Sequence, residues 1–213
     1  MSVALESFDE ETVLRETEKL LYLYTLKHVI RYGQTRDESD YTESVAEHVF
    51  GMHILADYFR PLEDPNAVLT MERVYQLITW HELDEIETGD IPSVRKTDED
   101  RIQAARMLDI SLNRLPSLLN NSVRNVSAEY ENQSSPEAKY VKAIDKLEPL
   151  IHSYHPLGKG TQHQLKLTTE SSVRIKEPYI KDFPFIKVFS DTLHSVMDRE
   201  GYFYTEPTNS GTQ

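Results

Sequence analysis

Hydrophobic and polar residues follow one another along the chain with the three- and four-residue spacing that is typical of amphipathic helices. The pattern predicts helices over about residues 11–32, 44–59, 70–88, from residue 97 onward, 116–131, 135–152 and 185–199. Residues 155–180 are ambiguous on this pattern. Gly is scarce, with 7 residues, which also favours helices over strands bounded by Gly-rich turns. We therefore expect an all-α fold, a single helical bundle.

Several predicted helices carry terminal signals that support their boundaries. The sequence Ser44-Val-Ala-Glu47 is a capping-box pattern at the start of the second helix. Gly89 stands where a C-terminal cap of the third helix belongs. Ser135 is followed by Pro136, a residue that is common at the first helical position.

The length and the sequence pattern predict one domain. A chain of 213 residues is long enough to bury a core of its own, and no internal repeat is visible. Residues 1–10 and 205–213 are expected to be terminal tails, and residues 11–204 to form the domain.

The composition narrows the classes of partner. The formal net charge of −13 argues against binding to a nucleic-acid polymer, which needs a basic surface. A small anionic substrate is compatible with it, because a metal and a few Arg side chains create a local positive site. The absence of Cys excludes disulfides and Cys-ligated zinc. With no long apolar run and no apolar leader, we expect no membrane span and a cytoplasmic protein.

Titratable side chains fall on the inward faces of three predicted helices. These residues are His48 on the second helix, His81, Glu82 and Glu85 on the third, and Asp145 on the helix over 135–152. His48, for example, lies between Val45 and Met52 on an apolar face. Burying an unpaired carboxylate is costly, so these groups need partners. A divalent cation is the simplest partner that two His and two carboxylates share.

Each of these residues also has an ordinary structural interpretation. A single His at the edge of a helix face is more often a hydrogen-bonded core residue. Asp145 beside Lys146 fits a surface ion pair, and the dipeptide His81-Glu82 is common by chance. Only the conjunction of all of them favours a metal site.

Four motifs resemble those of the HD-domain 5′-deoxynucleotidases. The stretch His81-Glu-Leu-Asp-Glu-Ile-Glu-Thr-Gly-Asp-Ile-Pro92 resembles the family's central motif, His-Asp-x-x-Glu-x-x-x-Gly-Asp-hydrophobic-Pro. Glu47-His48 resembles its first histidine motif, and Ala143-Ile-Asp-Lys-Leu-Glu148 its closing Asp-Lys-x-Glu motif. Arg31-Tyr32 resembles its Arg-aromatic pair. The resemblance covers about residues 31–152, in the expected order.

The resemblance implies a metal-dependent phosphohydrolase with an HD-domain fold and one divalent metal ion, which could be Mn²⁺, Co²⁺, Mg²⁺, Zn²⁺ or Fe²⁺. The implied metal ligands are His48, His81, Glu82 and Asp145. The implied catalytic residues are Glu85 and the sugar-contacting Asp90, and the implied substrate-binding residues are Arg31 and Tyr32. A homodimer is also implied, for which the apolar residues of the last helix could supply an interface, or they could pack on the chain's own core.

The sequence departs from the family motif at residue 82, where Glu replaces Asp. Glu offers the same carboxylate, but its extra methylene moves the oxygens by roughly one bond length, whereas ligand distances are tight to about 0.2 Å. We therefore expect either an altered metal preference or an impaired site.

The residues suggest a mechanism for such a site. Glu85 lies one helical turn after His81, where it could take a proton from water or pass it to the leaving oxygen. Arg31 could clamp the phosphate with two hydrogen bonds. Asp90 could bind a sugar hydroxyl, or it could serve the turn alone. Lys96, with Arg36 and Arg95, could contact phosphate, or these residues could form a solvated charged loop.

Four functions remain open on the sequence. The first is removal of the 5′-phosphate from (deoxy)nucleoside monophosphates, and the second is hydrolysis of (deoxy)nucleoside triphosphates. The third is a regulatory protein that binds nucleotides through an impaired metal site, and the fourth is a helical interaction domain. No His occurs between His81 and Asp145, whereas two-metal HD proteins place extra His there, so we expect one metal.

Overall fold

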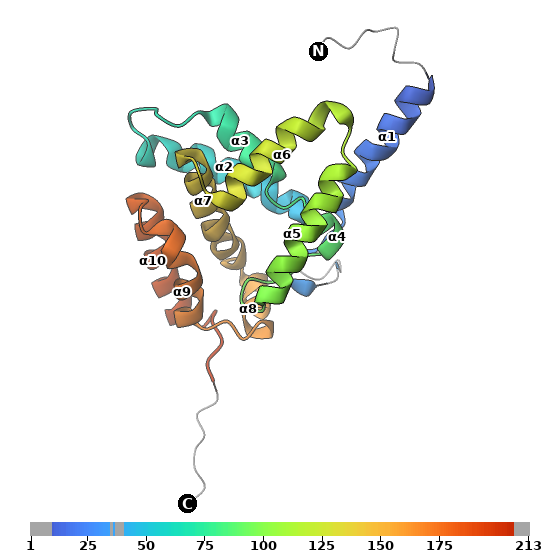
Figure 1. The fold of residues 1–213 in the computed structure, drawn as a ribbon. Coiled ribbons are helices and arrows are strands. Elements are labelled where there is room, and N and C mark those ends of the chain that lie inside the picture. Colours follow the sequence, from blue (N-terminus) through green and yellow to red (C-terminus); the bar gives the residue numbers. More distant parts are fainter. Residues whose placement is uncertain (1–9, 35, 37–40, 207–213) are drawn as a thin grey trace, which may run out of the picture.

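The computed structural model describes residues 10–34, 36 and 41–206, and over these ranges the fold is all-α (Figure 1). The α-helices are α1 (Glu10–Tyr24), α2 (Val45–Glu63), α3 (Met71–Trp80), α4 (Glu85–Thr88), α5 (Asp98–Asn113), α6 (Ser117–Asn132), α7 (Pro136–Ser153), α8 (Lys159–Gln164), α9 (Thr169–Ile180) and α10 (Pro184–Arg199). The described residues form no β-strand, only an isolated bridge between Ile30 and Ser44. None of the described helices is both long and apolar enough to span a bilayer.

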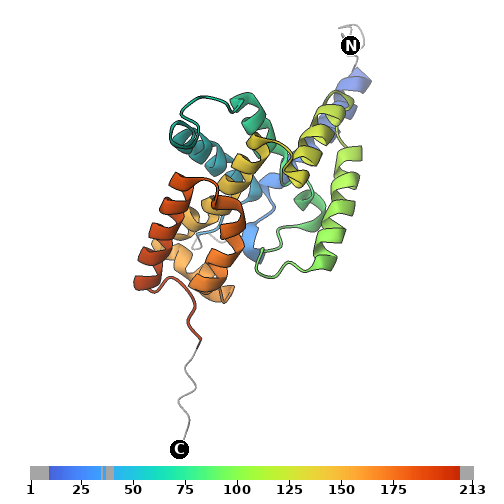
Figure 2. The same ribbon diagram turned by 60° about the vertical axis from the view of Figure 1, so that its left-hand side comes forward.

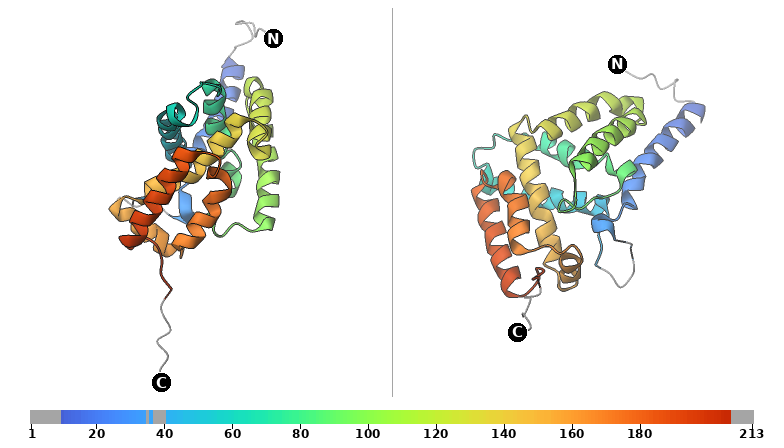
Figure 3. Two further views of the ribbon diagram at one scale, coloured as in Figure 1. Left: turned by 90° about the vertical axis from the view of Figure 1, so that its left-hand side faces the viewer. Right: turned by 60° about the horizontal axis from the view of Figure 1, so that its bottom comes forward.

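Helix α7 runs through the middle of the bundle. It packs against α2, α3 and α6 and against α9 and α10, so the α9–α10 pair lies on one side of it and α5 and α6 on the other (Figures 1 and 3). Its interior face includes Tyr140, Val141, Ile144 and Leu147, each with no exposed surface. Asp145, which is 3% exposed, lies among these buried apolar residues. The central helix therefore presents a carboxylate to the core.

The predicted helix starts are confirmed where capping residues mark them. Ser44 accepts a hydrogen bond from the Glu47 N–H, and the Glu47 carboxylate accepts one from the Ser44 N–H, which completes the capping box of α2. Thr97 and Asp100 form the same arrangement at α5. Ser135 accepts from the Ala138 N–H at 3.0 Å at the start of α7. Each such cap stabilises its helix by about 1 kcal/mol.

The predicted helix over 11–32 is wrong in its second half. Helix α1 ends at Tyr24 and is followed by a 3₁₀ turn over Thr25–Lys27, and the chain reaches an extended residue at Ile30 before a second 3₁₀ turn over Arg31–Gly33. The Arg31 N–H donates to the Glu43 carbonyl at 2.9 Å, so tertiary pairing replaces the helical bond. In Figure 2 α1 projects from one end of the bundle.

The predicted continuous helix over 70–88 is also wrong. Helix α3 ends at Trp80, a turn covers residues 81–84, and the short helix α4 follows. Gly89 does end this segment as predicted, with a φ of 66° and its N–H bonded to the Glu85 carbonyl at 3.0 Å. The break falls on the residues of the central motif, and it changes the direction in which they point.

One other predicted helix end differs from the structure, and the segment left ambiguous is helical. Helix α2 continues past residue 59 to Glu63, with Pro61 in its last turn. The Asp64 N–H still bonds to the Arg60 carbonyl at 2.8 Å, which closes that turn despite the proline. The ambiguous residues 155–180 form a 3₁₀ turn followed by α8 and α9.

Helices α9 and α10 are joined by a buried histidine. The His194 Nδ1–H donates to the Ser190 carbonyl at 2.8 Å, and Nε2 therefore accepts a hydrogen bond from the Ser172 hydroxyl at 2.9 Å. On α10, Ile186 is fully buried, whereas Phe185 and Val188 are 49% and 65% exposed. The apolar residues of the last helix thus divide between the core and the surface.

We predict that His194 makes stability fall at acidic pH. Burial lowers the pKa of His194 to about 4, so below about pH 6.5 the unfolded state binds a proton that the folded state resists. The wild type should lose about 2 kcal/mol of unfolding free energy at pH 5 relative to pH 7.5 through this residue. Urea unfolding of the wild type and of His194→Gln measures it, and equal pH dependence in both proteins would contradict the prediction.

Candidate metal centre

Four side chains that the sequence singled out converge in the core. His48 from α2, His81 at the end of α3, Glu82 in the following turn and Asp145 from α7 each offer a ligand atom, and these atoms all lie within 4.8 Å of one another. His48 Nε2 is 3.5 Å from Asp145 Oδ1, and His81 Nε2 is 3.2 Å from Glu82 Oε1. The spatial convergence that the metal-site hypothesis requires is therefore present.

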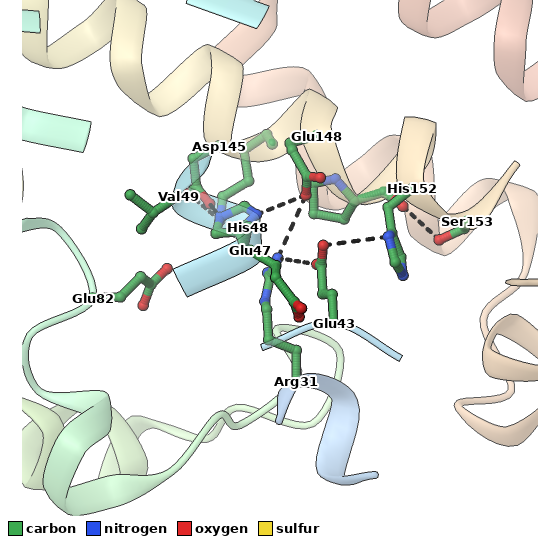
Figure 4. Close-up of polar contacts among 12 residues, drawn as sticks. Arg31, Glu43, Glu47, His48, Val49, Glu82, Asp145, Glu148, His152 and Ser153 are labelled. Carbon is green, nitrogen blue, oxygen red and sulfur yellow. Dashed lines mark hydrogen bonds and ion pairs between the residues drawn. The ribbon is translucent and has the colours of Figure 1, made fainter. Parts of the chain in front are cut away.

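Both imidazoles are oriented by hydrogen bonds from their other nitrogen. His48 Nδ1 donates to Glu148 Oε2 at 2.6 Å (Figure 4), and His81 Nδ1 donates to the Ile78 carbonyl at 2.8 Å. Neither Nε2 atom has a hydrogen-bond partner, although both are buried. A buried nitrogen without a partner is costly, and this pattern of a donor to a carboxylate or carbonyl behind a free Nε2 is typical of metal-binding His.

The environment of His48 favours positive charge. Burial and Arg31 lower the pKa of His48, but Glu148 and Asp145 outweigh them and raise it to about 9.

The four side chains of the cluster, His48, His81, Glu82 and Asp145, supply two nitrogen and two carboxylate ligands, a donor set that suits a first-row divalent cation. The residues present therefore fit one such ion.

Asp145 divides its two oxygens between different partners. Oδ1 faces the imidazoles, while Oδ2 accepts from the Tyr130 hydroxyl at 3.1 Å and pairs with Lys146 at 3.0 Å and Lys142 at 3.3 Å. Burial alone would raise the pKa of Asp145, but the two lysines outweigh it and hold the pKa well below its usual range. The carboxylate is thus kept ionised toward the histidines.

Glu82 reaches the cluster despite its additional methylene. The turn over residues 81–84 replaces the regular helix there, and the Glu85 N–H bonds to the Glu82 carbonyl at 3.2 Å, one residue closer than in an α-helix. Burial would raise the pKa of Glu82, but His81 outweighs it and lowers the pKa. The backbone break thus accompanies the replacement of the family's Asp by Glu.

Arg31 and Tyr32 lie beside the cluster in a buried network of carboxylates. Arg31 Nη1 pairs with Glu43 Oε1 at 2.7 Å and lies 3.5 Å from Glu148 Oε2 (Figure 4). Arg31 Nε is 3.6 Å from Asp90 Oδ1. Tyr32 adopts a left-handed conformation, with a φ of 64°, and its N–H donates to Asp90 Oδ2 at 2.5 Å. This strained residue, costing about 1–3 kcal/mol, ties Arg31 to Asp90.

A cavity of about 650 Å³ opens onto the cluster. It is lined by the remaining predicted site residues, Glu85, Asp90, Lys96, Arg31 and Tyr32, as well as by His81, Glu82 and Asp145. Glu85 is 6% exposed, and burial beside Glu82 raises its pKa well above the usual range. The other two phosphate candidates lie elsewhere, since Arg36 pairs with Glu47 and Arg95 donates to the Gln164 carbonyl at 3.2 Å.

Basic side chains gather in this cavity of an acidic protein. They are Arg31, Lys96, Arg101, Lys142, Lys146, Arg174 and Lys176. Helix α5 and the loop before it contribute one wall, and α7 and α9 contribute another. Six carboxylates, those of Glu82, Asp84, Glu85, Asp90, Glu131 and Asp145, line the cavity as well, so an anionic ligand would bind at the walls that carry the cations.

Several residues that support or surround the cluster could not be recognised from the sequence pattern. Glu148 lay inside a recognised motif but received no role, although it follows Ile144 by one helical turn on the buried face of α7. Lys176 lay in the ambiguous region, yet it shares a buried stripe with Ser172 and Ile180 at four-residue spacing. Glu43 gave no periodic signal, because it precedes the capping residue of α2.

We predict that Glu148→Gln lowers metal affinity by about 10- to 100-fold, because it weakens the acceptor that orients His48. A competition titration with a chelating indicator measures the affinity. Glu72→Gln is the matched control, since Glu72 is exposed on α3. Equal metal affinity in the two variants would count against the role of Glu148.

Known proteins share both the sequence and the fold. The family described as HD domain matches residues 23–187. The chain is 35% identical over 152 residues to the 5′-deoxynucleotidase HDDC2 of Danio rerio, covering 68% of this chain and 73% of that protein. It is 30% identical over 166 residues to the 5′-deoxynucleotidase hdd1 of Schizosaccharomyces pombe, covering 75% and 81%.

Among solved structures, the fold is similar to that of a predicted metal-dependent phosphohydrolase from Magnetospirillum magnetotacticum. The TM-score is 0.75 at 21% identity, and the match covers 92% of this chain and 100% of that one. An HD-domain phosphohydrolase from Listeria innocua gives a TM-score of 0.61 at 19% identity, covering 87% and 91%. Together with the motifs, these relationships show that the chain belongs to the HD-domain family, among its 5′-deoxynucleotidase-like phosphohydrolases.

Proposed function

We propose that this protein is a metal-dependent phosphohydrolase that removes the 5′-phosphate from deoxynucleoside monophosphates. The observation that carries the proposal is the pair of unpartnered Nε2 atoms of His48 and His81, which face two carboxylates beside a cavity that several Arg and Lys side chains line. The relatives named 5′-deoxynucleotidase support the choice of substrate. The ligand roles of His48, His81, Glu82 and Asp145 are part of this proposal.

A divalent cation in the cluster would supply Lewis-acid activation of water and would neutralise charge on the phosphate. The chain's own residues do the rest. His48 and His81 are held in place by Glu148 and the Ile78 carbonyl, so their nitrogens need no rearrangement to bind. Lys142 and Lys146 keep Asp145 ionised. These supporting groups thus orient the two histidines and keep Asp145 ionised before a metal binds.

Glu85 is placed for proton transfer. It lines the cavity next to Glu82, and its Oε2 atom is buried without a hydrogen-bond partner. A carboxyl in this position could accept a proton from the attacking water and deliver it to the leaving 5′-oxygen. Burial and Glu82 raise the pKa of Glu85, so its ionised form is a stronger base than an exposed Glu, and the protonated form can then donate to the leaving oxygen.

Asp90 and Arg31 frame the rest of the substrate. Asp90 is already bonded to the Tyr32 N–H, so one of its oxygens is committed and the other faces Arg31 Nε at 3.6 Å. We propose that it accepts a hydrogen bond from a sugar hydroxyl at the cavity wall. Lys96 also lines this wall and is a candidate contact for the nucleotide.

Glu82 bears on the alternative of an impaired metal site. Its carboxylate lies within the cluster rather than outside it, so the geometry favours a metal-loaded protein with a changed metal preference.

The limits of the domain, residues 11–204, the cytoplasmic location and the homodimer stay predictions. For a dimer, Phe185 and Val188 on α10 offer exposed apolar surface.

We predict that the purified protein releases phosphate from deoxynucleoside monophosphates only when a divalent metal is bound. A malachite-green assay on mono- and triphosphate panels, with and without inorganic pyrophosphatase, measures the reaction and separates the two substrate classes. Chelation should abolish turnover, and added Mn²⁺ or Co²⁺ should restore it. Metal-loaded protein with no turnover on any nucleotide would refute the proposed function.

We predict that Glu85→Gln lowers kcat by about 10²- to 10⁴-fold, because proton transfer is lost. Elemental analysis should show that the variant retains its metal. Glu99→Gln, at an exposed position on α5, is the control and should leave kcat unchanged. Unchanged turnover in Glu85→Gln would leave Glu85 without a catalytic role.

A further inference from the structure

Lys176 is a buried lysine on the wall of the cavity. It lies on the stripe of α9 that faces the interior, with Ser172 one turn before it and Ile180 one turn after it. Its side chain lines the cavity, and the residue is only 8% exposed. Among the residues that the structure describes, no carboxylate forms an ion pair or hydrogen bond with its ammonium group.

A buried cation without a partner is unfavourable, and proteins rarely retain one without a reason. Burial, followed by the nearby charge of Lys146, lowers the pKa of Lys176 to about 8. Asp145 partly offsets these effects, and both residues line the same cavity. The fold thus keeps a cation in a position where it costs stability and where it faces the cavity.

Arg31, Lys142 and Lys146, three other buried or half-buried cations of this region, already have carboxylate partners. Arg31 lies among the carboxylates of Glu43, Glu148 and Asp90, which exceed its single positive charge. Lys142 and Lys146 share Asp145. Lys176 is therefore the cation on this wall that is both buried and uncompensated within the described part of the chain.

We propose that Lys176 binds the phosphate of the substrate, donating a charge-assisted hydrogen bond to a phosphoryl oxygen from the α9 side of the cavity. The inference rests on the proposed function for the identity of the phosphate, a monoester dianion. Its physical basis is independent, because the dianion supplies the negative charge that the side chain lacks. Helix α9 lies outside the recognised motifs and becomes part of the substrate site.

The test compares Lys176→Met with Lys181→Met in metal-loaded protein. Methionine keeps the length of the side chain and removes the charge, and Lys181 is an exposed lysine at the end of the same helix. The first measurement is the melting temperature with and without inorganic phosphate. Without phosphate, Lys176→Met should melt at or above the wild-type temperature, because an uncompensated buried charge has been removed. Phosphate should stabilise the wild type and Lys181→Met but not Lys176→Met.

The second measurement separates phosphate recognition from general damage. Lys176→Met should lower kcat/KM for a deoxynucleoside monophosphate by about 10- to 100-fold, which is typical of a lost hydrogen bond to a charged group. Binding of the corresponding deoxynucleoside, which lacks the phosphate, should be unchanged, and so should the metal content.

Three results would overturn the inference. They are an undiminished phosphate response in Lys176→Met, a lower melting temperature without phosphate, and equal losses in deoxynucleoside and monophosphate binding. The last two would assign Lys176 a structural role. If the wild type hydrolyses no nucleotide, the proposed function fails, yet the phosphate-dependent stabilisation still tests Lys176. The two proposals therefore fail in different measurements.

Discussion

Asp145 is buried at the centre of the bundle, and its two oxygens meet opposite demands. One faces the imidazoles of His48 and His81, and the other accepts from Lys142, Lys146 and a tyrosine hydroxyl. A buried carboxylate is tolerated only when such partners are present. The partners come from α2, from the end of α3, from α6 and from α7 itself, so this one side chain connects the helices that meet around it. The packing of the core and the chemistry of the site therefore depend on the same side chain and its partners.

A second layer of charge surrounds this centre and determines which groups remain available. Glu148 is shared between His48 and Arg31, so it orients a ligand and holds a cation at once. Gly51 makes room for it, since an added Cβ there would lie 3.0 Å from Glu148 Oε1. Arg31 is enclosed by carboxylates, whereas Lys176 on α9 forms no ion pair with the residues that the structure describes. Lys176 is therefore the buried cation of the cavity that remains available to an anion. The acidic chain thereby offers an anion a buried cation inside the cavity.

The sequence predicted the parts of this structure that local rules govern. The caps at Ser44 and Ser135 follow from side-chain hydrogen bonds to neighbouring backbone groups, and helical periodicity placed His48 and Asp145 on inward faces. The helix over 70–88 was predicted as continuous, because nothing local marks the break after Trp80. With that break, Glu82 lies in one cluster with His48, His81 and Asp145. Likewise, the proposed role of Lys176 depends on the absence of a carboxylate partner among the described residues of the folded protein. Helical periodicity does not predict which side chains lie close together in space.

A single cation is expected to occupy the space between His48, His81, Glu82 and Asp145. Anomalous diffraction from crystals of the metal-loaded protein tests it directly, with data collected above and below the absorption edge of the metal. The account predicts one strong peak bonded to both Nε2 atoms and to the two carboxylates. Metal-loaded crystals with no peak at this position, or with the ammonium of Lys142 or Lys146 filling it, would contradict the account.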